Sequence, residues 1–399
     1  MLFAKAKLLD GRTELKDGND LGTLACLCVR FALDFDLADE YGREMAQTQI
    51  ERHMRICITA TAGLDKLITI AGSEPFLAEA ACELISGSDV EAVRHLAKNS
   101  NLNCIDRGQR GEQVAALLIM GARDAAFTRT KSRAVSVDDF MKALLPVSQY
   151  EKLEFARPQF WQDGKDKPFS EAFEGYSTWF NHVIKVQHTD MINTQHLWKF
   201  ITRGAMVMCV DNQRGVDIVL PVCKTEEKLS ERTVTAILIQ VKNDKSFTNF
   251  DKTLFDGMNP FRVGLFDAAN PNPLPVIRLV FALASHTAAV VFPEVPNRKN
   301  HPDKFTAYDI WCAGLSPDTF RDIDDDLDCY NTLLLRSLQP HDAFDLKEVE
   351  DKYRDEDTAI DRGAQRRRVV PLWVSDEVHN YIHDPTNFSN PAPAMVSEG

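Results

Sequence analysis

The chain has 399 residues, enough for two or three domains of ordinary size. Its hydrophobic content of 44% is typical of a globular protein and excludes disorder over most of the length. There is no uninterrupted apolar run of about eighteen residues and no signal-peptide pattern. We therefore expect an intracellular protein that neither spans a membrane nor is secreted.

The net charge of −13 argues at first against nucleic-acid binding, because phosphate groups are bound by basic surfaces. The charge is unevenly distributed, however. Residues 300–361 include 17 acidic and 6 basic side chains, so most of the excess negative charge belongs to this segment. The remainder is close to neutral and leaves room for a basic groove. If the protein binds nucleic acid, we expect the acidic segment to lie away from the binding site.

The first 105 residues are expected to form an all-helical region. Apolar residues recur at helical spacing over 21–33, 51–70 and 75–85. Ser73 and Pro75 have the order of a helix start, with the serine as the capping residue and the proline just inside. No catalytic pattern occurs in this region, so these helices are a candidate docking surface for a protein partner.

Residues 106–300 combine helices with strands. The expected helices are 108–126, 137–145, 171–183, 194–201 and 247–255. The expected strands are short β-branched runs at 205–210, 216–222, 234–242, 276–283 and 288–292. This order of one helix, three strands, a helix and two more strands predicts an α/β fold. We expect a mixed sheet flanked by helices, with a helical insertion at 127–203.

The C-terminal part divides into two segments. Residues 301–375 are expected to form an acidic helical segment with a helix at 317–337, and low hydrophobicity predicts a disordered tail at 376–399. Three consecutive arginines at 366–368 are compatible with a nuclear localisation signal, a phosphate contact or a simple solvated run.

Common metal and cofactor motifs are absent from the sequence. The nine cysteines contain no C-x-x-C pair, and Cys26 and Cys28 would point to different faces of a helix. Three histidines lack the i, i+4 spacing of a helical metal site: His182, His188 and His196. The aspartates at 322–328 lack the glycine and terminal glutamate of a calcium loop, which favours a solvated helix face.

Two of the expected strands, 216–222 and 234–242, bring polar residues together. If they form a hairpin whose turn is centred near residue 228, the numbers of paired residues sum to about 457. Asp217 then lies opposite Gln240, and one face of the pair is wholly apolar. The other face carries Asp217, Gln240 and Lys242 because the period of a strand is two. Carboxylate and amide oxygens suit Mg²⁺ or Mn²⁺, and a lysine can stabilise charge on a phosphate.

This arrangement resembles the PD-(D/E)XK nuclease superfamily, in which an Asp on one strand and an acid-x-Lys on the next hold the metal. The resemblance implies a restriction-endonuclease-like domain in which Asp217 and Gln240 are metal ligands and Lys242 is the catalytic lysine. Glu112 resembles the acid that many members carry on the helix before the first strand, and would be a further metal ligand. Gln240 departs from the usual carboxylate, as it does in the Mrr-like restriction enzymes, and should weaken Mg²⁺ binding.

A fainter resemblance extends over most of the chain. Segments 72–75, 311–315 and 362–368 look like a group of fungal proteins related to crinkler and retrotransposon-hot-spot proteins, which join a P-loop ATPase to a nuclease. The chain has no P-loop motif, so ATPase activity is not implied.

The function implied by these resemblances is a Mg²⁺- or Mn²⁺-dependent endonuclease that acts on nucleic acid, most simply DNA. The alternative is a catalytically inactive nuclease fold that binds nucleic acid or a protein partner.

Overall fold

The computed structural model describes residues 1–16, 20–35, 40–60, 67–88, 91–99, 110–161, 165–210, 213–267, 269–293 and 305–338. They fall into two units. The first contains residues 1–56 and 70–338, and the second contains 57–69 together with 339–399. The expected arginine contact at 366–368, the end of the acidic segment and the disordered tail lie outside the described residues.

The N-terminal region is helical, as the sequence predicts. Its helices are α1 (Leu2–Leu8), α2 (Asp20–Phe31), α3 (Glu40–Arg52), α4 (Pro75–Ser86) and α5 (Ala92–Asn99). The prediction of one helix over 51–70 is wrong. Strands β1 (Ile56–Ala60) and β2 (Leu67–Ile70) follow α3 and pair with each other. The isoleucines at positions 56 and 58 of β1 have the strand period, which the helical interpretation overlooked.

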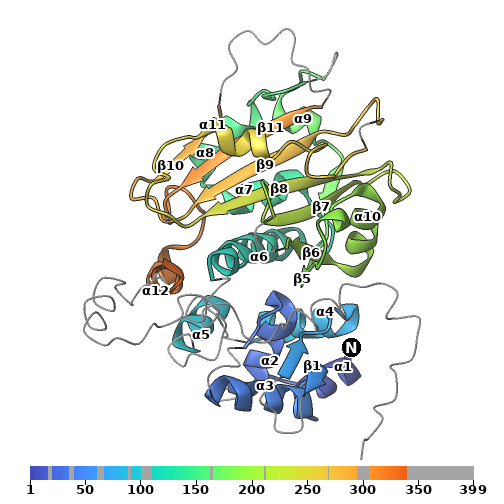
Figure 1. Ribbon diagram of the computed structural model, residues 1–399, viewed down its shortest axis with the longest axis vertical. Helices are drawn as coiled ribbons and strands as arrows, with labels where there is room; N and C mark the ends of the chain where they lie inside the picture. The colour runs from blue at the N-terminus through green and yellow to red at the C-terminus, as the bar shows by residue number, and fades with distance from the viewer. Residues whose placement is uncertain are drawn as a thin grey trace, which may run out of the picture. The chain divides into compact units, whose positions relative to one another are not determined.

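The central feature of the fold is a mixed sheet of nine strands within the described residues (Figure 1). The strands are β3 (Val135–Ser136), β4 (Tyr176–Thr178), β5 (His182–Lys185), β6 (Ala205–Met208), β7 (Ile218–Lys224), β8 (Val234–Lys242), β9 (Val276–Ala282), β10 (Ala289–Val291) and β11 (Ala307–Ala313). The main order is β10-β11-β9-β8-β7-β4-β3, and β6 joins β5 to β7. Strands β8, β9 and β11 are parallel, and β7 is antiparallel to β8. The expected α/β fold is confirmed.

Most of the remaining helices flank this sheet, and α12 packs against α5 and α6. They are α6 (Arg110–Thr130), α7 (Val137–Leu144), α8 (Val147–Glu154), α9 (Phe169–Ala172), α10 (Thr194–Arg203), α11 (Lys252–Gly257) and α12 (Leu327–Leu338). Helix α11 connects the parallel strands β8 and β9, as the sequence predicts in outline, although it begins five residues later than expected.

Two expected boundaries differ from the structure. Residues 127–203 are not a purely helical insertion, because they contribute β3, β4 and β5 to the sheet, and α9 with β4 and β5 replaces the helix expected at 171–183. The acidic segment does not begin at residue 301 as a separate helical part either. Strand β11 lies between β9 and β10, where parallel pairing with β9 buries all seven of its residues. The helix expected at 317–337 begins only at Leu327.

The hairpin register agrees with the sequence prediction. Ile218 pairs with Ile239 and Leu220 pairs with Ile237, so the paired numbers sum to 457. Strand β8 has the predicted bounds, Val234–Lys242. The face that carries Gln240 is covered as well, which the sequence reasoning did not anticipate. Leu238 and Val219, on the face of Gln240, belong to the same buried cluster as residues of α10 and α11.

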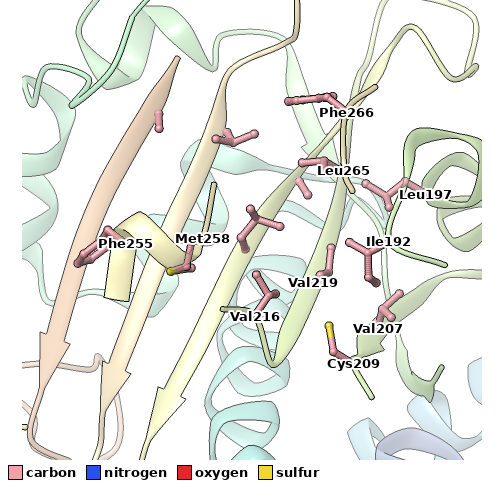
Figure 2. Packing of buried hydrophobic residues seen from close by; sticks show 14 of the residues in the cluster. Ile192, Leu197, Val207, Cys209, Val216, Val219, Phe255, Met258, Leu265 and Phe266 are labelled. Carbon is pink, nitrogen blue, oxygen red and sulfur yellow. The ribbon is translucent and has the colours of Figure 1, made fainter. Parts of the chain in front are cut away.

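Figure 2 shows this cluster, with Leu197 of α10 on one side and Phe255 of α11 lying over the strands. The opposite face is covered by aromatic side chains. Phe281 of β9 contacts Phe320 at 5.1 Å between ring centroids, and Tyr308 of β11 contacts Phe169 of α9 at 5.7 Å. A sheet buried on both faces exposes polar groups mainly at the ends of its strands. Among the described helices, none has the length and apolar character needed to cross a membrane.

Candidate functional site

Asp217 lies immediately before β7, next to the end of β8. Its main-chain N–H donates to the carbonyl of Ile239 at 2.9 Å. Its carboxylate Oδ2 accepts the main-chain N–H of Val241 at 2.6 Å. These two contacts hold Asp217 beside Gln240, which is the neighbourhood that the predicted register gives it.

A glycine two residues earlier fixes the approach of the chain to Asp217. Gly215 has φ +92°, in the left-handed region, and a Cβ there would overlap the carbonyl group of Gly257 at the end of α11. A larger residue would be both strained and obstructed. The path of residues 215–217 therefore depends on this close contact with α11.

Gln240 supplies the second oxygen of the site. The residue is 7% exposed, and its amide oxygen Oε1 is buried without a hydrogen-bond partner in the described part of the chain. A buried, unsatisfied carbonyl costs about 1–3 kcal/mol, so a ligand or ion that binds this oxygen would remove an energetic penalty. A hard cation is a partner of the right kind, since carboxylate and amide oxygens bind Mg²⁺ and Mn²⁺. The residues present thus fit a metal ion.

The site differs from a carboxylate-rich metal centre. Within the described ranges, no group of three or more His, Cys, Asp or Glu side chains is placed to hold a metal ion. The contacts described above place the carboxylate of Asp217 here, together with the neutral amide of Gln240. We therefore expect weaker binding than at a site with two or three carboxylates.

Lys242 supplies the positive charge. Its side chain is half-buried, with Nζ 5.9 Å from the centre of the Phe247 ring. Burial raises the pKa of Asp217, while the Val241 N–H and the charge of Lys242 act in the opposite direction. The net raised pKa means that the ionised carboxylate is held at a cost, as expected for a ligand that lacks its cation.

We expect Asp217→Asn to stabilise the metal-free protein at neutral pH. The folded-state pKa of Asp217 lies above its unfolded value, so ionisation costs stability as the pH rises through that range. The melting temperature of the variant should exceed that of the wild type at pH 7, and the difference should shrink toward about pH 3, where both states protonate the aspartate. Thermal unfolding across this pH range, without divalent metal, measures the effect. A variant that melts below the wild type at pH 7 would contradict it.

The first turn of α6 lies against the end of β8. A Cβ at Gly111 would overlap the side-chain amide of Asn243, the residue after Lys242. Glu112 is the next residue of the helix and is half-buried. The structure therefore brings Asp217, Gln240 and Lys242 together and places the helix start that carries Glu112 beside them, without a direct contact from Glu112 to Asp217 among those described.

Asn243 is a member of this neighbourhood that the sequence reasoning missed. Its amide oxygen Oδ1, like that of Gln240, is buried without a partner in the described ranges. Its position directly after the Gln-x-Lys sequence was the available signal. Asn243 links the end of β8 to the start of α6.

Gly111→Ala and Gly121→Ala should have opposite effects although both lie in α6. Alanine normally favours a helix by about 1 kcal/mol over glycine. At Gly121 a Cβ meets nothing within 4 Å, so the substitution should raise the free energy of unfolding by about 0.5–1 kcal/mol. At Gly111 the Cβ would displace Asn243, so that variant should be less stable than the wild type. Urea denaturation compares them, and an equal gain at both positions would show that Gly111 is not packed against Asn243.

The described part of the acidic segment, residues 305–338, has ion pairs of its own. Asp309 is buried against Arg278 of β9, and Asp326 pairs with Arg94 of α5. The charged side chain that acts on Asp217 is Lys242, and no acid of 305–338 contributes to the shift of its pKa. Residues 339–361 lie outside the described part.

Two cavities lie elsewhere. One of about 280 Å³ is lined by residues of α2, α6 and α12. Another, of about 750 Å³, is lined by residues of α8, β10 and β11. Neither of these two cavities is lined by Asp217, Gln240 or Lys242.

Comparison with known proteins gives one family match. Residues 16–257 match the family described as Domain of unknown function (DUF8736). The matched segment runs from the N-terminal helices to α11 and includes the candidate site residues. Searches of curated proteins and of solved structures found no match. Because the family match covers more than half of the chain, the protein belongs to the DUF8736 family.

Proposed function

We propose that this protein is a metal-dependent endonuclease that hydrolyses phosphodiester bonds, with DNA as the simplest substrate, and that it acts inside the cell. The observation that carries the proposal is the buried amide oxygen of Gln240, which has no hydrogen-bond partner among the described residues and lies next to the carboxylate of Asp217 and the ammonium of Lys242. These are the groups that a divalent cation and a bound phosphate require.

The order of elements supports the proposal. Helix α6 precedes the antiparallel strands β6, β7 and β8, and α11 leads to β9, which is parallel to β8. Asp217 immediately precedes β7, and Gln240 and Lys242 come at the end of β8. This is the placement that the resemblance to the PD-(D/E)XK nucleases implies for their metal ligands and lysine.

Each residue has a distinct role in this proposal. Asp217 and Gln240 would hold the cation, with Glu112 as a candidate further ligand from α6. The cation would polarise the phosphate and make a water molecule more acidic. Lys242 would bind a phosphate oxygen and stabilise the negative charge that develops as the bond breaks. Asn243 would keep the start of α6 in register with this end of the sheet.

The alternative is an inactive nuclease fold that binds nucleic acid or a protein partner through the N-terminal helices. The neutral Gln240 in place of a carboxylate favours it, because one negative charge fewer faces the metal. Such a module would bind its partner whether or not divalent metal is present.

Nicking of supercoiled plasmid DNA separates these two functions. We expect the full chain to convert supercoiled DNA to open circles with Mg²⁺ or Mn²⁺ and not with EDTA, and we expect Asp217→Ala to be inactive. Asp267→Ala, at an exposed aspartate far along the chain from the site residues, is the matched control and should keep wild-type activity. No nicking with either metal, or equal nicking by Asp217→Ala, would favour the binding module.

A further inference from the structure

A second group of polar side chains lies outside the candidate metal site. Ser73 precedes α4, and His182 begins β5, 109 residues further along the chain. The hydroxyl Oγ of Ser73 is 2.9 Å from Nε2 of His182, and Nδ1 of the same ring is 2.8 Å from Oδ1 of Asn181. The amide Nδ2 of Asn181 donates to the carboxylate of Glu79 at 2.8 Å. Four side chains thus form one hydrogen-bonded chain.

The direction of every bond in this chain is determined. The Glu79 carboxylate can only accept, so the nitrogen of the Asn181 amide faces it and the oxygen faces His182. The histidine must then carry its proton on Nδ1, which leaves the lone pair of Nε2 for the Ser73 hydroxyl. A nucleophile bonded to a base, with the base oriented by a third group, is the arrangement of nucleophilic catalysis.

The sequence predicts Ser73 as the cap of α4, and this prediction is wrong. The bond to His182 explains why. The cap is Glu74, whose carboxylate accepts the N–H of Leu77 at 2.8 Å. The Ser73 hydroxyl is therefore left for His182. Arg203 also lies close to Ser73. It donates hydrogen bonds to the main-chain carbonyl and to the hydroxyl oxygen of Ser73. Positive charge at this position would stabilise an alkoxide or oxyanion.

Exposed apolar side chains lie near Ser73, whereas its base is shielded. Ser73 is half-buried, but His182 is 0% exposed. Three large apolar side chains near Ser73 in sequence or space are exposed: Ile56 at 46%, Ile70 at 40% and Phe76 at 68%. The side chain of Ile56 reaches Gly72, since a Cβ there would lie 3.2 Å from its Cδ1. Apolar surface beside a nucleophile suits an acyl chain.

We propose that Ser73 is the nucleophile of a second site, independent of the proposed nuclease, that cleaves carboxylic esters with apolar acyl chains. His182 is its general base, Asn181 and Glu79 are positioning residues, and Arg203 stabilises the oxyanion.

The reaction needs only the ester and water. Ser73 Oγ bonds to the carbonyl carbon while its proton passes to Nε2 of His182. The carbon–oxygen bond to the alcohol then breaks, and the alcohol leaves with that proton. Water attacks the acyl-serine in the same way, giving up a proton to His182, and the serine recovers it as the carboxylic acid departs.

The protonation state of His182 fits this role at neutral pH. Burial first, and then the charges of Arg203 and Arg30, lower the pKa of His182 to about 4. A hydrogen bond with the main chain of Gly204 acts in the opposite sense. The ring is therefore neutral and able to accept a proton at neutral pH, although so weak a base predicts slow turnover.

The test is covalent labelling of the full chain with an alkyl fluorophosphonate, followed by intact mass measurement and peptide mapping. We expect one adduct at Ser73, and hydrolysis of p-nitrophenyl octanoate that this adduct blocks. Ser73→Ala should abolish both, while His182→Gln should slow labelling by about 10²-fold or more. Ser170→Ala, at a half-buried serine that donates to the carbonyl of Glu154, is the matched control.

In the Asp217→Ala variant, Ser73 should be labelled at the wild-type rate, because Asp217 belongs to the proposed metal site. The esterase proposal and the nuclease proposal can therefore fail separately. An unlabelled Ser73 in the folded wild type overturns the proposal even if the His182 variant does not fold. A folded His182→Gln that labels at the wild-type rate also overturns it. A role for these residues that is only structural would change the melting temperature without giving an adduct.

Discussion

Asp309→Ala is expected to lower the free energy of unfolding by about 3–5 kcal/mol, because it leaves a buried charge without its partner. Asp309 of β11 lies opposite Arg278 of β9, and Nε and Nη2 of the arginine each donate to one carboxylate oxygen at 2.6 Å. Both side chains are at most 5% exposed. In the variant, Arg278 would keep its bond to the carbonyl of Phe255 but no counter-charge.

Two controls show that the effect comes from this ion pair. Asp318→Ala removes an exposed aspartate of the same C-terminal segment and should change stability by no more than about 0.5 kcal/mol. The double variant Arg278→Met, Asp309→Leu replaces both charges by apolar groups and should recover most of the loss. Guanidinium denaturation monitored by circular dichroism measures all three. A loss below about 1 kcal/mol in Asp309→Ala would mean that the pair is not buried in solution.

Lys242→Ala is expected to lower the rate of plasmid nicking by about 10²–10³-fold while leaving metal binding nearly intact. The ammonium of Lys242 is close enough to Asp217 to oppose the rise in pKa that burial causes at that carboxyl. It is not one of the proposed metal ligands. Its proposed contribution is to stabilise charge that appears only as the phosphodiester bond breaks, so the loss should appear in the rate.

Lys245→Ala is the matched control for this variant, because it removes an exposed lysine three residues further along the same segment. It should nick DNA at close to the wild-type rate. The metal affinity of Lys242→Ala should match that of the wild type. Equal loss in the two lysine variants would point to a general effect of charge on DNA binding, and an unchanged rate in Lys242→Ala would remove Lys242 from the catalytic proposal.

The hairpin of β7 and β8 could be predicted from the sequence because two constraints agree. The polar segment between the strands places the turn, and a shift of one residue would exchange the two faces of each strand. The predicted pairing of Ile218 with Ile239 follows from these constraints and is observed. Gln240 and Lys242 are on the same face of β8 for the same reason.

Other elements could not be predicted from the local pattern of apolar residues. The apolar residues at 51–70 and 171–183 satisfy a helical period in part, yet residues 56–60, 67–70, 176–178 and 182–183 lie in strands. Strands β3 and β4 are only two and three residues long. Strands this short are defined by their partners in the sheet rather than by their own sequence. The pairing of β11 with β9 is also a long-range effect, which explains why the expected domain boundary at residue 300 fails.

The candidate site was accessible to sequence reasoning only where it is local. Asp217, Gln240 and Lys242 lie on one hairpin, so the strand period and the turn place them together. The contact of Gly111 with Asn243 and the bond of Ser73 to His182 join segments more than 100 residues apart. No periodicity encodes such contacts, because they depend on how the helices pack against the sheet.

Calorimetric titration of Mn²⁺ into the purified full chain tests the metal site most directly. We expect the wild type to bind weakly, Gln240→Glu to bind more tightly because a second carboxylate faces the ion, and Asp217→Ala to show no binding. The order of the three affinities is the prediction, and each protein should first be shown to be folded by its circular dichroism spectrum. Negligible and indistinguishable heats for all three would contradict the metal site at Asp217 and Gln240, and with it the proposed nuclease.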